Sequence, residues 1–320
     1  QKNGAPFLQH SLKRYGFLDF PDDGTGLPVG FTLTGSAGSQ TVGMTCAACH
    51  TRQISVGNDT YRIDGGPALI DFETFLLDLD TAVETVLTDQ VSFDEFAKAV
   101  FGGLAPGPND VAALKGQVSA WHMRFGALIA GSLRNEGQTK WGPGRLDAIA
   151  MIFNRLTGLD LGPPPSLLIE DNIKPADAPA RYPFLWNASK QDKTQWSGFA
   201  DNGNDRLALA RNVGQVFGVF GEFQPCKKDA NIDYLHKNSV NFAGLSQIEQ
   251  LVKKIGPPKW PWPIDRARAE IGKKIFERAT HNGGCVECHA INDGIARLPD
   301  EKTWNTPICT VGTDTRQHRV

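Results

Sequence analysis

Two Cys-x-x-Cys-His pentapeptides constrain this chain more than any other feature of its 320 residues. In each pentapeptide the two thiols stand three residues apart, so one turn of backbone can present both to the vinyl groups of a haem. The His that follows can then turn its imidazole to the iron. The sequence therefore predicts two covalently attached c-type haems. Their ligating residues are Cys46, Cys49 and His50 for the first, and Cys285, Cys288 and His289 for the second.

Other uses of paired cysteines fit these pentapeptides less well. Two Cys-x-x-Cys pairs can share one zinc ion, but such a site needs neither His, and the intervening segment 51–284 far exceeds the usual spacing. A thioredoxin-like dithiol belongs in a βαβ pattern, whereas the second pentapeptide follows an amphipathic helical stretch. Paired disulfides would likewise leave both His residues unexplained. We therefore favour haem attachment.

Length, charge and hydropathy set broad limits on the class of protein. A chain of this length can build two domains, each with its own core. Its 33 basic and 35 acidic residues nearly balance, which argues against nucleic acid as a partner. No apolar run approaches the roughly 20 residues of a membrane span. A stiff connector, Pro258-Lys259-Trp260-Pro261-Trp262-Pro263, predicts an N-terminal haem domain with large loop insertions over 1–258 and a C-terminal cytochrome-c-like haem domain over 259–320.

Hydrophobic periodicity predicts a mainly α fold with long loops and little β structure. Ser92 with Glu95 and Ser246 with Glu249 match capping boxes that open helices. The proline-rich segment 162–183 predicts a loop that covers a surface. The expected helices span about 71–88, 92–101, 109–130, 144–156, 246–255 and 264–279.

The second axial position of each iron separates catalysis from electron transfer. Met or a second His closes an electron-transfer haem, whereas a catalytic haem keeps that position open. The chain has three methionines and none of them follows His289. His318 lies downstream as a possible iron ligand, but it is equally a surface residue of a terminal segment, or the true ligand lies beyond Val320. His122 is predicted to be a buried structural residue and His236 a solvated one.

Two cysteines remain outside the pentapeptides. Covalent haem attachment in bacteria takes place outside the cytoplasmic membrane, so we expect a periplasmic or secreted protein. In that oxidising compartment Cys226 and Cys309 are predicted to form a disulfide.

The motifs together resemble the bacterial dihaem cytochrome c peroxidase superfamily, and more closely its rubber-oxygenase-like branch. The resemblance implies two cytochrome-c-like haem domains with neighbouring haems. One haem would react with O2 or peroxide, and the other would relay electrons. The resemblance also implies that His50 is the proximal, catalytic ligand of the reactive haem. The stretches that carry it are Cys46 to His50, Ile63 to Ala68, Trp141 to Arg145, Arg211-Asn212, Pro257 to Pro261, Cys285 to His289 and Val311 to Asp314.

Further candidates follow from residue type and from the resemblance. Arg145 and Arg211 can each meet a haem propionate with a bidentate guanidinium. The oxygen-rich stretch Asp201 to Asp205 is a candidate calcium loop, although a plain turn explains it too. Aromatic residues that either line a distal pocket or fill the core are Phe184, Trp186, Trp196, Phe217 and Phe220.

Three functions remain open on the sequence. The first is an oxygenase or oxidase that acts on an unknown organic substrate, the second a hydrogen peroxide reductase, and the third a dihaem electron carrier. Each would exchange electrons with small donor or acceptor proteins. A peroxidase needs a distal acid or base, for which only His122 and His236 are internal His candidates. The scarcity of Met and His argues against the carrier, so we favour the enzyme.

Overall fold

A computed structural model describes residues 7, 11–20, 24–36, 40–102, 106–286, 289, 312 and 314–319. The chain forms two compact units. The first comprises 1–183, 212–241 and 315–320, and the second comprises 184–211 and 242–314. The predicted division near residue 258 stays a prediction. None of the described helices is long and apolar enough to cross a bilayer.

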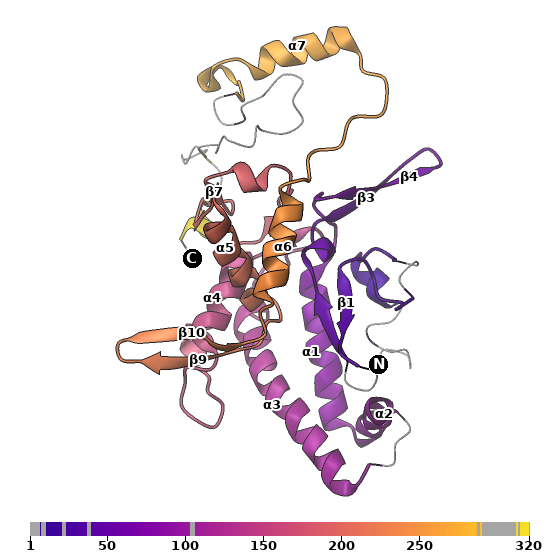
Figure 1. The fold of residues 1–320 in the computed structure, drawn as a ribbon, viewed down its shortest axis with the longest axis vertical. Helices are drawn as coiled ribbons and strands as arrows, with labels where there is room; N and C mark the ends of the chain where they lie inside the picture. The colour runs from indigo at the N-terminus through magenta and orange to yellow at the C-terminus, as the bar shows by residue number, and fades with distance from the viewer. Residues whose placement is uncertain are drawn as a thin grey trace. The chain divides into compact units, whose positions relative to one another are not determined.

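Four α-helices form the frame of the first unit, and α1 packs along α3 (Figure 1). Asp71, Asp89 and Asp147 cap α1, α2 and α4, each accepting a hydrogen bond from a backbone amide three residues on. The predicted helices near 71–88 and 109–130 are confirmed. The expected capping box at Ser92 is wrong, because Asp89, three residues earlier, caps that helix. The bounds are α1 Phe72–Thr88, α2 Gln90–Phe101, α3 Pro108–Leu133 and α4 Ala148–Gly158.

The expectation of a mainly α, cytochrome-like fold with little β structure is wrong. Of the described residues, 44% are helical and 16% lie in strands, which form five small antiparallel sheets. Alternation over short hairpins gives a weaker signal than a helical stripe, so the periodicity missed them. The paired strands are β1 Phe31–Thr34 with β2 Thr41–Met44, β3 Thr51–Val56 with β4 Asp59–Asp64, β5 Arg145–Leu146 with β6 Ala180–Arg181, β7 Lys193–Thr194 with β8 Ala200–Asp201, and β9 Phe223–Lys228 with β10 Asn231–Asn238.

Short 3-10 turns complete the described part of the chain. Among them, η3 (Cys46–Ala48) carries the first pentapeptide and η7 (Arg316–His318) carries His318. The remaining turns are η1 Ser11–Tyr15, η4 Glu170–Asn172, η5 Ala188–Lys190 and η6 Thr280–Asn282.

One apolar cluster forms the core of the first unit. It joins aromatic residues of α1 to Trp141, which is fully buried, and to Ala48 of the first pentapeptide. Phe75 makes edge-on contacts with the rings of Tyr15 and Phe17. The first pentapeptide is thus built into the main core of this unit.

The second unit contains α6 (Phe242–Val252) and α7 (Arg266–Phe276), while α5 (Asp205–Gly218) runs from this unit into the first. Helix α6 begins before Ser246, so the expected capping box there is wrong. Helix α7 confirms the predicted helix near 264–279, and Asp265 caps it. Its apolar residues Ile271 and Ile275 are exposed rather than buried.

A buried carboxylate ties α1 to α3. Asp80 is almost fully buried, and its two oxygens meet His122 Nε2 at 3.0 Å and an Arg134 guanidinium nitrogen at 2.7 Å. A buried charge is tolerated only when it is paired and hydrogen-bonded, as it is here. His122 is half-buried, and its contact with Asp80 is consistent with its predicted structural role.

We expect Asp80→Asn to lower the free energy of unfolding by about 2 kcal/mol, because it removes the buried charge that Arg134 and His122 face. Urea denaturation followed by circular dichroism measures the change. Asp94→Asn on α2, whose exposed carboxylate accepts from Gln90, is the control and should shift stability by less than about 0.5 kcal/mol. Equal effects of the two substitutions would contradict the structural role of Asp80.

Candidate functional site

The first pentapeptide forms a tight turn between two hairpins. It lies in η3, between the end of β2 and the start of β3. The His50 amide donates to the Cys46 carbonyl at 2.9 Å, and the Cys49 amide donates to the same carbonyl at 3.2 Å. The Cys49 carbonyl in turn accepts from the Ala68 amide at 3.0 Å. These bonds bring the two cysteines and the His of the pentapeptide into one compact turn.

Gly30 packs closely against the backbone of this turn. Its φ is +86°, and a Cβ built on it would lie 2.1 Å from the Ala48 backbone nitrogen. Its carbonyl also accepts from the Thr45 amide at 2.7 Å. Only glycine allows this backbone to approach the pentapeptide so closely.

The His50 ring is oriented by a residue far away in sequence. Its Nδ1 lies 2.8 Å from the Pro183 carbonyl oxygen. A carbonyl only accepts, so Nδ1 carries the proton and Nε2 keeps its lone pair. The structure therefore prepares Nε2 of His50 as a metal-ligating nitrogen.

Tyr182 stands beside this imidazole, with 6.4 Å between the two ring centroids. Its hydroxyl is buried and has no hydrogen-bond partner among the described residues. Burial raises the pKa of this hydroxyl, so it stays a neutral donor. An unpaired buried donor is costly and calls for a partner supplied from outside the chain.

The two thiols of the first pentapeptide differ in exposure, since Cys46 is exposed and Cys49 is half-buried. Burial, and secondarily the neighbouring Cys46, raise the pKa of the Cys49 thiol to about 12. Cys49 therefore lacks the lowered pKa that is typical of a reactive redox thiol.

One hydrogen bond of the first pentapeptide recurs between the described residues of the second. The His289 amide donates to the Cys285 carbonyl at 2.8 Å, which matches the His50 to Cys46 bond. Cys285 follows α7 closely, and its amide donates to the Phe276 carbonyl at 2.9 Å. Cys285 and His289 are exposed, and Cys288 lies outside the described residues.

Arg145 is connected to the His50 site through the β5–β6 pair. It lies opposite Arg181 in that pair, and β6 leads directly into Tyr182 and Pro183. One guanidinium nitrogen of Arg145 donates to the Trp141 carbonyl at 3.1 Å, and the residue is otherwise exposed. Arg145 thus keeps donors available for an anionic group.

Trp141 anchors the segment that carries Arg145. Its backbone amide donates to the buried Glu73 carboxylate, and its indole Nε1 donates to the Ala176 carbonyl at 2.7 Å. Burial raises the pKa of Glu73. Asp147 adds a second buried anchor, because it accepts from the amides of Ala150 and Ala178.

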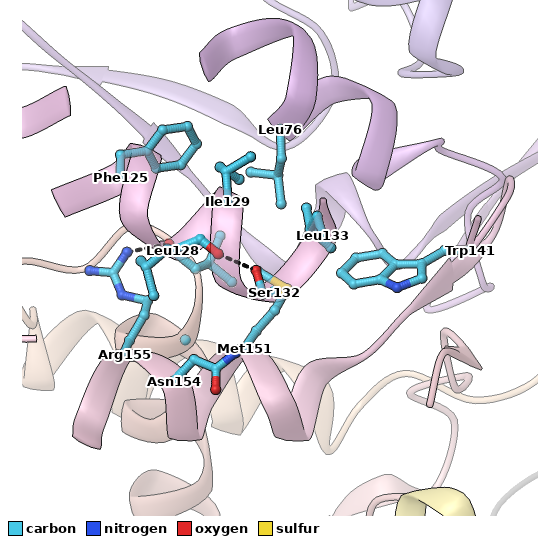
Figure 2. Close-up of a pocket in the computed structure, with 12 residues that line it drawn as sticks. Leu76, Phe125, Leu128, Ile129, Ser132, Leu133, Trp141, Met151, Asn154 and Arg155 are labelled. Atoms are coloured by element: carbon cyan, nitrogen blue, oxygen red, sulfur yellow. Dashed lines mark hydrogen bonds between the residues drawn. The ribbon is translucent and has the colours of Figure 1, made fainter. Parts of the chain in front are cut away.

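A pocket opens in the same core, between α3 and α4 (Figure 2). Its walls are mostly apolar, and its polar groups are few: Ser132, Asn154 and Arg155. Arg155 donates to the Val219 and Gly221 carbonyls, while its Nε has no partner among the described residues. An apolar pocket with a few polar groups is typical of small-molecule sites. Its lining consists of Leu76, Phe125, Leu128, Ile129, Ser132, Leu133, Trp141, Met151, Asn154, Arg155, Gly218 and Val219.

Arg211 lies in the second unit, where its guanidinium is already engaged. It donates to Asn202 Oδ1 and to a Glu249 carboxylate oxygen, both at 2.8 Å, and all three residues are largely buried. The predicted propionate contact of Arg211 therefore competes with a formed ion pair.

The expected calcium loop uses its oxygens internally. Asp201 pairs with Lys193, and Asp205 pairs with Lys253. Asn204 Oδ1 accepts from the Leu207 amide at the start of α5. Because these oxygens face cations and backbone donors, we propose no calcium site here.

The remaining sequence candidates are dispersed. His236 lies in β10 and His318 in η7, where both are exposed. Phe220 joins the core cluster that also includes Cys49, while Phe217 packs on Phe223. Phe184, Trp186 and Trp196 belong to the second unit. Cys226 lies in β9 and Cys309 lies outside the described residues, so their disulfide stays a prediction.

Sequence reasoning missed Gly30, Tyr182 and Pro183. No local pattern marks them, since the contact of Pro183 with His50 joins residues 133 positions apart. Tyr182-Pro183 ends the proline-rich segment, for which the sequence predicts only a surface loop. The Gly-rich setting of the first motif was the one available signal for Gly30.

Comparison with known proteins adds one relationship. No family model matches the chain, and no solved structure matches it. The chain is 29% identical over 333 residues to an uncharacterized protein, y4iJ, of Sinorhizobium fredii (strain NBRC 101917 / NGR234). The match covers 94% of this chain and 52% of that protein, so the chain spans about half the length of this curated relative.

We expect Gly30→Ala to destabilise the protein because the new methyl group would meet the backbone of Ala48. Gly57→Ala is the matched control, since Gly57 also has a positive φ, of +60°, but nothing lies within 4 Å of the place that its new methyl group would take. The control should cost about 1–2 kcal/mol from backbone conformation alone. Gly30→Ala should cost roughly 1–3 kcal/mol more in urea denaturation. Equal costs would show that the turn does not depend on this contact.

Proposed function

We propose that this chain is an exported dihaem c-type oxidoreductase. One haem is attached at Cys46 and Cys49 and the other at Cys285 and Cys288. The first haem, held by His50, reacts with O2 or peroxide, and the second relays electrons to it from small partner proteins. The proposal concerns haem attachment and chemistry and does not require a cytochrome c fold.

The hydrogen bond from His50 Nδ1 to the Pro183 carbonyl is the observation that carries the proposal. With Nδ1 as the donor, Nε2 is the ring nitrogen that would ligate the iron. Ligating histidines almost always donate their other ring nitrogen in this way, which orients the ring and raises ligand basicity.

The residues around His50 fit a bound haem in three further respects. The turn brings the Cys46 and Cys49 thiols together with the His, beside a core that is otherwise apolar. The buried hydroxyl of Tyr182 supplies an unused donor beside the imidazole. Arg145, on the strand paired with β6, keeps guanidinium donors that can meet a propionate.

A bound haem would supply one-electron chemistry and a position for O2 or peroxide. The chain's own residues have separate tasks. Cys46 and Cys49 would hold the porphyrin by adding their S–H bonds across its vinyl groups. His50 would ligate iron, and the apolar core around Phe220 would exclude water. The small cavity of Figure 2 lies in the same apolar core, and the buried Arg155 is one of the residues that line it.

One observation favours the electron carrier as a second candidate. Met44 and Met151 both pack against the core cluster that includes Cys49, whereas Met123 is exposed. A thioether from either could close the sixth position and make the haem low-spin. A resting spectrum with a high-spin component that responds to cyanide supports the enzyme. Two low-spin haems without that response would support the carrier.

Mass spectrometry of the denatured protein tests attachment directly. We expect the mass of the chain plus two haems, with one haem lost in Cys46→Ala/Cys49→Ala and the other lost in Cys285→Ala/Cys288→Ala. Cys226→Ala is the control and should retain both. A chain that is expressed with the bacterial haem-attachment machinery and still shows the unmodified mass would contradict the proposal.

Tyr182→Phe tests whether the unused hydroxyl meets the bound group. Removal of an unpaired buried hydroxyl should leave stability unchanged or raise it. The variant should nevertheless shift the reduction potential or the visible spectrum of the haem held by His50. Tyr234→Phe, whose hydroxyl donates to the Leu156 carbonyl at 2.9 Å, is the control and should leave the spectrum unchanged. A Tyr182→Phe variant with unchanged reduction potential and unchanged spectrum would show that this hydroxyl does not contact the bound haem.

A further inference from the structure

The β9–β10 hairpin brings three chemically different ligands together. The Cys226 thiol, an Asp233 carboxylate oxygen and a ring nitrogen of His236 all lie within 4.8 Å of one another. Cys226 and Asp233 are half-buried, and His236 is exposed. We infer that this triad is a binding site for a divalent transition metal ion of the zinc class, separate from the pentapeptides.

Strand register explains how the three side chains meet. Cys226 lies directly opposite Asp233, so their side chains share one face of the hairpin. In a regular strand His236 would point to the other face, because it stands three residues after Asp233. The register shifts between Asp233 and Lys237, and this irregularity returns the His236 ring to the side of Asp233. Irregularities of this kind commonly re-aim a side chain toward a site.

Hydrogen bonds hold the irregular segment of β10, between Asp233 and Lys237, in place. Tyr234 donates to the Leu156 carbonyl of α4 at 2.9 Å. The Leu235 amide donates to one Asp233 oxygen at 2.9 Å, and Asn238 donates to the Leu235 carbonyl at 3.0 Å. The Leu235 bond orients the carboxylate as an outer-shell partner orients a metal ligand. The triad therefore does not depend on a metal to form.

The donor set matches the chemistry of zinc. Zinc takes cysteine sulfur, histidine nitrogen and carboxylate oxygen in tetrahedral sites. A thiolate from Cys226 and a carboxylate from Asp233 would neutralise both charges of the ion. Three protein ligands leave a fourth position for water, which is typical of exchangeable or catalytic sites.

Lys228 is the group that opposes binding. Its ammonium lies 3.3 Å from an Asp233 oxygen and is largely exposed. It must release that oxygen when an ion binds, and its exposure makes this movement inexpensive. The proposal also replaces the expected disulfide for Cys226, since one sulfur cannot serve both.

Zinc titration of the full chain tests the site. Chelator-treated protein in reducing buffer should take up zinc by calorimetry. Zinc should also slow iodoacetamide alkylation of Cys226 at least about 10-fold, as measured on its peptide. Asp233→Asn and His236→Asn should each weaken this protection by at least about 10-fold. Lys228→Ala should strengthen it, because it removes the competing cation. His281→Asn, another exposed His, is the matched control and should behave like the parent.

The readout is specific to the hairpin and independent of haem attachment, because it follows one peptide. His236 is exposed, so its substitution leaves the fold intact and the test interpretable. The proposal is overturned if zinc fails to protect Cys226 or if His281→Asn and His236→Asn weaken protection equally. It is also overturned if Cys226 of the unreduced protein is found in a disulfide with Cys309.

Discussion

The hydrogen bond from His50 to the Pro183 carbonyl is the interaction on which the candidate site depends. It joins the pentapeptide turn to the end of the proline-rich segment and selects the tautomer of the imidazole. A ligating His usually donates its second ring N–H to an acceptor. The Pro183 carbonyl can only accept, so Nδ1 of His50 must be the donor. Tyr182 and the β5–β6 pair are part of the same arrangement, because they place Pro183 where the imidazole can reach it.

The first unit also contains buried carboxylates that connect its segments by hydrogen bonds and ion pairs. Glu73 receives the Trp141 amide, Asp147 receives two backbone amides, and Asp80 joins α1 to α3. Each carboxylate is buried, and each accepts from at least one donor far away in sequence, which makes the arrangement specific as well as stable.

The resemblance to dihaem peroxidases predicted a mainly α fold, which the structure does not have. Haem attachment at the pentapeptides stays a prediction. The helical stripes predicted most of the α-helices of the first unit, because burial on one face leaves a periodic record. The sequence patterns did not predict the β-hairpins, because each hairpin is short and half-exposed. The apolar stripe of α7 predicted that helix correctly. Ile271 and Ile275 of the stripe are nevertheless exposed, so the periodicity predicted the helix but not which residues it buries. The two capping boxes failed because a serine and a glutamate three apart also occur inside helices or after another cap.

The sequence by itself determined the spacing of the two pentapeptides, from which haem attachment is a prediction. In each of them the His amide donates to the carbonyl of the first Cys. Only the tertiary structure decided which nitrogen of His50 donates to the Pro183 carbonyl, that Tyr182 places a buried hydroxyl beside that ring, and that Arg211 is paired with Glu249. It also decided that Cys226, Asp233 and His236 meet. Local spacing fixes bonds between neighbours, whereas contacts across many residues depend on how the whole unit buries its apolar surface.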